Sequence, residues 1–204
     1  SYEAAMGLSL VPVILYSGSM SMSKIVESQA GSLSSTIPII DSIVRFIPNW
    51  NIFTQFLAFG IFFIASIAEV NRAPFDLVEA EQELVGGFHT EYSGFRFAMF
   101  FLAEYINMFN MCAITATFFL GGWLGPTFEG ILPPFLSALM PTLWLGVKTF
   151  GLLFVYFWIR ATLPRLRYDQ LMELGWKRLI PISLIWLMIS AIVLAIRDFG
   201  LPWS

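Results

Sequence analysis

Five apolar stretches, each about long enough to cross a bilayer, constrain the fold of this chain more than any other feature. They occupy residues 4–22, 52–69, 97–120, 135–159 and 179–197. A transmembrane helix needs about 20 mostly apolar residues, and none of the stretches shows the two-residue alternation of a membrane barrel strand. Only 12% of the residues are charged, against about a quarter in soluble domains. The sequence therefore predicts an all-α polytopic membrane helix bundle, with five transmembrane helices in a single membrane domain over residues 1–204.

The distribution of Lys and Arg predicts the orientation of this bundle. Segment 70–96 carries two of these residues and segment 160–178 carries five. The segments on the other side carry three: Lys24, Arg45 and Arg197. Cytoplasmic loops retain positive charge, so both 70–96 and 160–178 are expected to be cytoplasmic. The chain opens with SYEAAMGLSL, without Met or a basic leader, so we expect it to be a fragment of a longer protein.

Charge and cysteine content exclude several classes of function. The formal net charge is −3, with no basic arm, which argues against nucleic acid as a partner. The single cysteine, Cys112, lies inside an apolar stretch, so neither a disulfide framework nor a cysteine metal site is possible within this chain. We expect Cys112 to be a small buried packing residue, and the chain to hold no metal, cluster or haem.

An acidic segment separates the second and third apolar stretches. The segment EVNRAPFDLVEAEQELVGGFHTEYSGFR, residues 69–96, holds six of the fourteen carboxylates of the chain. Pro74 and the Gly86–Gly87 pair predict a helix over about residues 75–85. Such a helix places three carboxylates on one face, Asp76, Glu79 and Glu83, while Glu81 projects away from them. A solvated cytoplasmic helix is the alternative, but acid is unexpected where cytoplasmic loops are usually basic.

Two ionisable residues lie inside apolar stretches. Glu104 lies about eight residues into the third stretch, or about 12 Å along a helix axis. Its burial favours a polar interior and a neutral or proton-exchanging form. The alternative is a structural hydrogen-bond partner. Lys148 lies in the middle of the fourth stretch, where it would pair with a glutamate or relay a proton. With Glu3 and Glu69 these residues indicate a proton-handling membrane protein, and the residues alone name no substrate.

Two long motifs resemble a known family. The stretch EVNRAPFDLVEAEQELVGGFHTEYSGFRFAMFFLAEYINM resembles the signature of the H-type membrane subunit of proton-pumping NADH:quinone oxidoreductase, respiratory complex I (NADH dehydrogenase subunit 1 family). WIRATLPRLRYDQLMELGWKRLIPISL resembles the last cytoplasmic loop and final helix of that family. Family members have eight transmembrane helices, so the resemblance implies that about three N-terminal helices, with part of the quinone site, are absent from this fragment.

The resemblance implies a role for each group of matched residues. The proton path would comprise Glu3, Glu69, Glu91 and Glu104, and Lys148 matches a lysine common in the family. The quinone chamber and acidic loop would comprise Arg72, Phe75, Asp76, Glu79, Glu81 and Glu83. The loop that docks peripheral subunits would comprise Arg160, Arg165, Arg167, Tyr168 and Asp169. No residue is expected to be catalytic in the sense of holding a redox centre.

The implied function is that of one subunit of a translocase. It would help to form the quinone-binding chamber and would couple quinone reduction to proton translocation through its chain of glutamates. Quinone would be its substrate at a shared site. Its expected partners are the peripheral-arm iron–sulfur and quinone-site subunits, the small membrane subunits that lead to antiporter-like subunits, and the lipid bilayer. The expected location is an energy-converting membrane, either the bacterial cell inner membrane or the mitochondrial inner membrane.

Three alternatives stay open at this point. The homologous membrane subunit of a membrane-bound hydrogenase or a related complex would keep the acids without needing to bind quinone. A stand-alone proton or ion transporter predicts paired interrupted helices, which the five stretches do not indicate. A purely structural membrane anchor would leave the cost of Glu104 and Lys148 unexplained. His89, beside Glu91, is expected to be a surface or capping residue more than a proton shuttle.

Overall fold

The computed structural model describes residues 2–31, 48–76, 92–125 and 134–199. Every regular element in these ranges is a helix, which confirms the all-α prediction. The elements are α1 (Tyr2–Ser17), α2 (Met22–Ser28), α4 (Asn51–Thr54), α5 (Phe56–Glu69), α6 (Phe95–Phe119), α7 (Pro134–Thr162), α8 (Tyr168–Glu173), the π-helical segment η2 (Leu174–Leu179) and α9 (Ile180–Phe199). Most of the helix predicted over residues 75–85 lies outside the described residues, and so do Glu79, Glu81, Glu83, His89 and Glu91.

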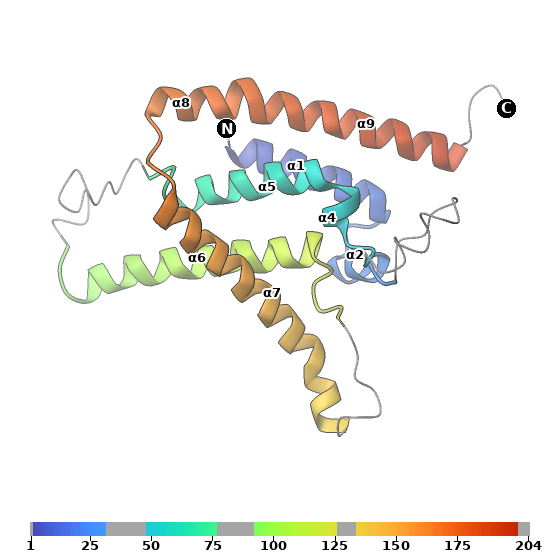
Figure 1. Cartoon of the computed structure of the whole chain (residues 1–204), viewed down its shortest axis with the longest axis horizontal. Coiled ribbons are helices and arrows are strands. Elements are labelled where there is room, and N and C mark those ends of the chain that lie inside the picture. The colour runs from blue at the N-terminus through green and yellow to red at the C-terminus, as the bar shows by residue number, and fades with distance from the viewer. Residues whose placement is uncertain (1, 32–47, 77–91, 126–133, 200–204) are drawn as a thin grey trace.

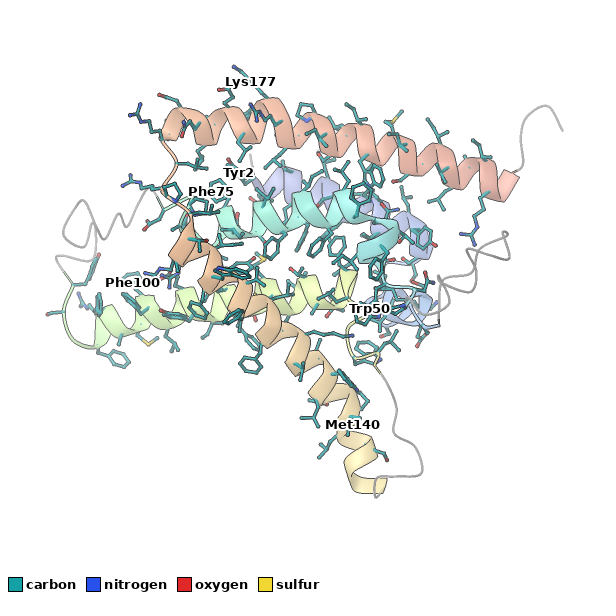
Figure 2. All side chains as sticks on the ribbon, in the orientation of Figure 1. Tyr2, Trp50, Phe75, Phe100, Met140 and Lys177 are labelled. Carbon is teal, nitrogen blue, oxygen red and sulfur yellow. The ribbon has the colours of Figure 1, made fainter. Side chains whose placement is uncertain are left out.

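The long helices form a bundle with two distinct ends (Figure 1). α1 lies against both α5 and α9, while α6 lies beside α5 and is crossed obliquely by α7. The start of α1, the end of α5, the start of α6, the end of α7 and the start of α8 all lie at one end. We call this the inner end, because the distribution of Lys and Arg predicts that it faces the cytoplasm, and we call the opposite end the outer end. Figure 2 shows Tyr2 and Phe75 at the inner end and Trp50 at the outer end.

The helices carry the expected membrane character. Three are long and apolar enough to cross a membrane: Phe95–Phe119, Ser137–Thr162 and the continuous helix Tyr168–Arg197. α1 and α2 make a fourth candidate if this pair, bent by 64°, is one span, and α5 is a shorter apolar helix. The described residues therefore form an all-α polytopic membrane bundle with three to four candidate spans. The count of five spans stays a prediction.

Several helix ends differ from the bounds expected from hydropathy. α1 stops at Ser17, where Gly18 takes a φ of +64° and turns the chain before α2 begins. At the other extreme, α7 continues to Thr162 and the last helix begins at Tyr168, so only residues 163–167 of the expected loop 160–178 are not helical. Hydropathy marks where the bilayer ends, whereas a helix continues into water as long as its residues favour helix and its backbone stays paired.

Buried amides hold the outer end together. Gln29, which is 1% exposed, donates through Nε2 to the carbonyls of Phe118 at 3.2 Å and Ile25 at 3.2 Å. Its Oε1 accepts a hydrogen bond from the backbone N of Asn51 at 3.1 Å, and Asn51 Nδ2 donates to Phe118 O at 2.9 Å. Each buried polar group left unpaired would cost about 1–3 kcal/mol. The fully used amide of Gln29 therefore ties α2 and the start of α4 to the end of α6.

Gly121 supplies a turn that no larger residue fits. Its φ is +73°, and a Cβ added there would lie 2.8 Å from both Cδ1 and Nε1 of Trp50. We expect Gly121→Ala to lower the free energy of unfolding by about 1–3 kcal/mol, because it adds both backbone strain and overlap. Thermal unfolding of the purified full-length protein tests this. Gly60→Ala is the matched control, since a Cβ at Gly60 meets nothing within 4 Å, and equal behaviour of the two variants would contradict the assignment.

Candidate functional site

A turn after α5 directs Arg72 into the bundle. Asn71 takes a φ of 53°, the Ala73–Pro74 peptide is cis, and the backbone N of Phe75 donates to Arg72 O at 2.8 Å. The sequence suggested that Pro74 stands in the first turn of a helix. In the structure it lies within a turn. Arg72 is only 4% exposed, although it lies three residues after the end of α5 at Glu69.

Arg72 and Glu104 form an ion pair in the interior at the inner end. Arg72 Nε contacts Glu104 Oε1, and the two side chains are 5% and 14% exposed. The atoms approach as ions without the alignment of a hydrogen bond, and Arg72 Nη2 is buried with no hydrogen-bond partner among the described residues. The guanidinium carbon also lies 5.0 Å from the centroid of the Tyr105 ring, a cation–π distance. We call Arg72, Glu104 and Tyr105 the Arg72 cluster.

A pair of aromatic rings and two hydrogen bonds to backbone carbonyls lie beside the Arg72 cluster. Phe75 is 5% exposed, and its ring centroid lies 5.5 Å from that of Tyr2. The hydroxyl of Tyr2 donates to Leu171 O at 2.6 Å, and the backbone N of Leu166 donates to Pro74 O at 2.9 Å. The turn after α5 is thereby joined to α1 and to the connection between α7 and α8.

Two other predicted acids that the structure describes, Glu3 and Glu69, lie on the surface. Glu3, in the first turn of α1, and Glu69, the last residue of α5, are both exposed. Asp76 is half-buried. The sequence therefore identified Arg72 and Glu104 individually, and the structure brings these two together. Tyr105 and Tyr2 were not predicted, and the only signal for Tyr105 was its place beside Glu104.

Lys148 has a different environment from the one expected. Its Nζ donates to the carbonyls of Leu120 at 2.7 Å, Gly122 at 3.0 Å and Leu124 at 2.5 Å. It also lies 4.5 Å from the ring centroid of Trp50. Three carbonyls use all three donors of an ammonium group. At 1.5 Å per residue, Leu120 is about 24 Å along α6 from Glu104, so the partner of Lys148 is the carboxyl end of α6 and not that glutamate.

The predicted docking residues form an accessible surface at the inner end. Arg165, Arg167, Tyr168 and Asp169 are exposed, and Arg160 is half-buried. The backbone N of Arg167 donates to Gln170 Oε1 at 3.2 Å, which caps the start of α8. A pocket of about 320 Å³ lies beside them, with lining that includes Gln170, Glu173 and Arg178.

The described residues contain no group of His, Cys, Asp and Glu side chains arranged to hold a metal ion. Cys112 is fully buried in the apolar core shared by α5, α6 and α7, as predicted. A buried guanidinium with a free N–H can bind an acceptor oxygen, and a paired carboxylate responds to any change of charge beside it.

Comparisons with known proteins agree with this picture. A model of the family described as NADH dehydrogenase matches residues 1–191. The chain is 49% identical over 199 residues to the H 2 subunit of the NADH-quinone oxidoreductase of Koribacter versatilis (strain Ellin345). That match covers 97% of this chain and 52% of the relative. The chain thus spans about half the length of the curated relative that it matches.

Proposed function

The chain belongs to the NADH dehydrogenase family, and on this premise we propose that it forms part of the quinone-binding chamber of an NADH-quinone oxidoreductase and couples quinone reduction to proton translocation. The observation that carries the proposal is the buried ion pair between Arg72 and Glu104. It lies where the acidic segment leaves the bundle, so it is suited to link events in that segment to the membrane interior.

The turn at Arg72 offers chemistry that a quinone headgroup requires. Arg72 Nη2 is buried and has no hydrogen-bond partner among the described residues, so it can donate to a carbonyl oxygen. Phe75 and Tyr2 supply an adjoining aromatic wall. A quinone is apolar enough to enter from lipid, and its carbonyls accept hydrogen bonds. We therefore assign Arg72 and Phe75 to the chamber, and the acids Asp76, Glu79, Glu81 and Glu83 to the loop that borders it.

Coupling follows from the charges involved. Reduction of a quinone to a quinol takes up two electrons and two protons. A carboxylate and a guanidinium in contact can be buried because each offsets the charge of the other, and either ion alone would be costly there. A transient negative charge on the quinone would compete with Glu104 for Arg72. Carboxylates that interact in this way bind protons in a mutually dependent manner, so a change in the chamber can alter protonation along a path through Glu3, Glu69, Glu91 and Glu104.

The remaining residues complete the proposed assembly. The exposed surface of Arg160, Arg165, Arg167, Tyr168 and Asp169 would dock peripheral-arm subunits, including the iron–sulfur subunit that donates electrons. Small membrane subunits leading to antiporter-like subunits would receive the proton path. The relative from Koribacter versatilis supports a bacterial cell inner membrane as the location. The contacts of Lys148 favour a structural role over a place in the proton path.

The alternatives receive less support. The 49% identity to a protein named as part of a quinone oxidoreductase favours quinone over the substrate of a hydrogenase-type complex. Interruptions do occur, between α1 and α2 and at Gln55 between α4 and α5. Both lie at the outer end of the bundle, whereas a transporter places its broken helices near the middle of the membrane.

Glu104→Gln tests the proposed function. In the assembled complex we expect quinone reductase activity and proton pumping to fall together by at least about tenfold, because Gln can neither pair with Arg72 as an anion nor take up a proton. Electron transfer from NADH to a water-soluble artificial acceptor should persist, which controls for loss of the peripheral arm. Glu104→Asp keeps the charge and should retain part of both activities. Unchanged pumping in Glu104→Gln would refute the role of this residue.

Asp76→Asn provides a second, independent test on the chamber side. The half-buried carboxylate lies directly after Phe75, at the start of the acidic segment. We expect a loss of about three- to tenfold in quinone-linked turnover, with the artificial-acceptor activity preserved. Loss of both activities together would indicate failed assembly and would contradict a specific role in the chamber.

A further inference from the structure

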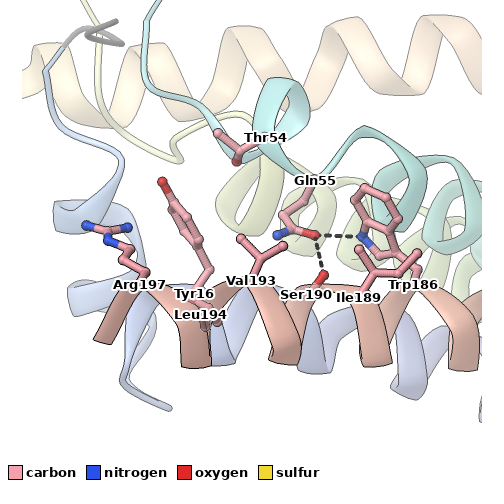
Figure 3. Close-up of a pocket in the computed structure, with 9 residues that line it drawn as sticks. All are labelled: Tyr16, Thr54, Gln55, Trp186, Ile189, Ser190, Val193, Leu194 and Arg197. Carbon is pink, nitrogen blue, oxygen red and sulfur yellow. Dashed lines mark hydrogen bonds between the residues drawn. The ribbon is translucent and has the colours of Figure 1, made fainter. Parts of the chain in front are cut away.

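A pocket at the outer end is lined by hydrogen-bond donors and apolar side chains. It has a volume of about 170 Å³ and lies between the end of α1, the junction of α4 and α5, and the last turns of α9 (Figure 3). Tyr16 and Arg197 line it from α1 and α9, and Thr54 lies across from them. The pocket is at the opposite end of the bundle from the Arg72 cluster, so the proposed quinone chamber does not account for it.

The side chain of Gln55 is oriented so that its amide nitrogen points into the pocket. The side chain is 6% exposed, and its Oε1 accepts hydrogen bonds from Trp186 Nε1 at 2.7 Å and Ser190 Oγ at 3.5 Å. These two donors fix which way the amide points. Its Nε2 is directed away from both, toward Tyr16 (Figure 3). The amide N–H groups of this largely buried residue are therefore available to a molecule in the pocket.

The other polar groups of the pocket are also donors. The hydroxyl oxygen of Thr54 is buried and has no hydrogen-bond partner among the described residues. Tyr16 brings a phenol and Arg197 brings a guanidinium, and no acidic residue is among the described residues that line the pocket. A buried hydroxyl without a partner, such as that of Thr54, costs about 1–3 kcal/mol. Together with the phenol of half-buried Tyr16 and the guanidinium of exposed Arg197, it matches a ligand that is negative and rich in acceptor oxygens.

The apolar wall of the pocket distinguishes between sources of such a ligand. Ile189 and Val193 line the pocket and are also 45% and 58% exposed, on the outward face of α9. The pocket is thus continuous with the surface that an apolar span presents to lipid. We propose that it binds one phospholipid, with the phosphodiester held by Arg197, Tyr16, Thr54 and Gln55, and an acyl chain lying along Ile189 and Val193.

The test uses the full-length protein in its assembled complex, reconstituted in nanodiscs of phosphatidylglycerol that contain a trace of the same lipid with a diazirine in its acyl chain. After photolysis, mass spectrometry compares labelling of α9 residues 186–197 with labelling of the exposed apolar face of α6, which reports ordinary surrounding lipid. We expect α9 to be enriched over α6 in the wild type, and Arg197→Gln to reduce the ratio about fivefold. Arg197→Lys should retain most of it.

Lys24→Gln is the matched control, because Lys24 is an exposed cation of α2 at the outer end. It should leave the ratio unchanged. Equal ratios in Arg197→Gln and wild type would overturn the proposal, since α9 would then meet only ordinary surrounding lipid. Abolition of labelling by excess inorganic phosphate would show a site for free phosphate instead. Absence of α9 labelling in the wild type would show that protein fills the pocket. That result would also overturn the proposal.

Discussion

Arg72→Met is expected to lower the free energy of unfolding of the full-length protein by about 3–5 kcal/mol. The substitution keeps an apolar chain of similar length but removes the guanidinium that contacts Glu104, whose side chain is only 14% exposed. It also removes the cation that lies over the ring of Tyr105. The expected readout is a marked fall in the temperature of thermal unfolding and in the amount of assembled complex in the membrane.

A double-mutant cycle isolates the pair itself. Glu104→Gln alone should also destabilise, because it leaves Arg72 buried and unpaired, whereas the double variant should be less destabilised than the sum of the two. We expect a coupling free energy of about 2–3 kcal/mol. Arg96→Met is the matched control, because Arg96 is exposed at the start of α6, at the same end of the bundle. Its effect should stay within about 0.5 kcal/mol, and an equal effect of Arg72→Met would contradict the buried ion pair.

Lys148→Met is expected to have a comparably large effect on assembly. The ammonium group holds three carbonyls of residues 120–124, at the carboxyl end of α6, which have no other hydrogen-bond partner among the described residues. Hydrogen bonds to a charged group contribute about 1.5–3 kcal/mol each, so the loss should be at least about 3 kcal/mol even if the turn relaxes partly. Lys177→Met, at an exposed lysine, is the control and should be nearly neutral.

Lys148→Arg separates a structural role from proton transfer. An arginine stays charged under all conditions that a protein tolerates, so it can donate to carbonyls but cannot release a proton. If Lys148 joins α7 to the end of α6, Lys148→Arg should retain most of the assembly and the full ratio of protons pumped to quinone reduced. A normally assembled Lys148→Arg complex that reduces quinone without pumping would show that Lys148 relays protons.

The candidate site was only partly predictable because its components are of different kinds. Glu104 and Lys148 stood out in the sequence because an ionisable residue in an apolar stretch is costly wherever it lies. Their partners did not stand out. The family resemblance assigned Arg72 to the chamber, but its position in a polar loop did not predict burial, and only the structure shows that its side chain enters the bundle. The carbonyls that bind Lys148 cannot be recognised in the sequence, because every residue has a backbone carbonyl.

Hydropathy and the scarcity of charge were sufficient to determine the fold class and the membrane character, and two contiguous motifs were sufficient for the family, because each of these is a property of neighbouring residues. The tertiary structure decided which charges meet, where the helices end and which donors face the outer pocket. Arg72 and Glu104 lie on separate elements, as do Lys148 and the turn that it holds. A pairing of that kind depends on distances of a few ångströms between side chains, and these exist only once the helices have packed.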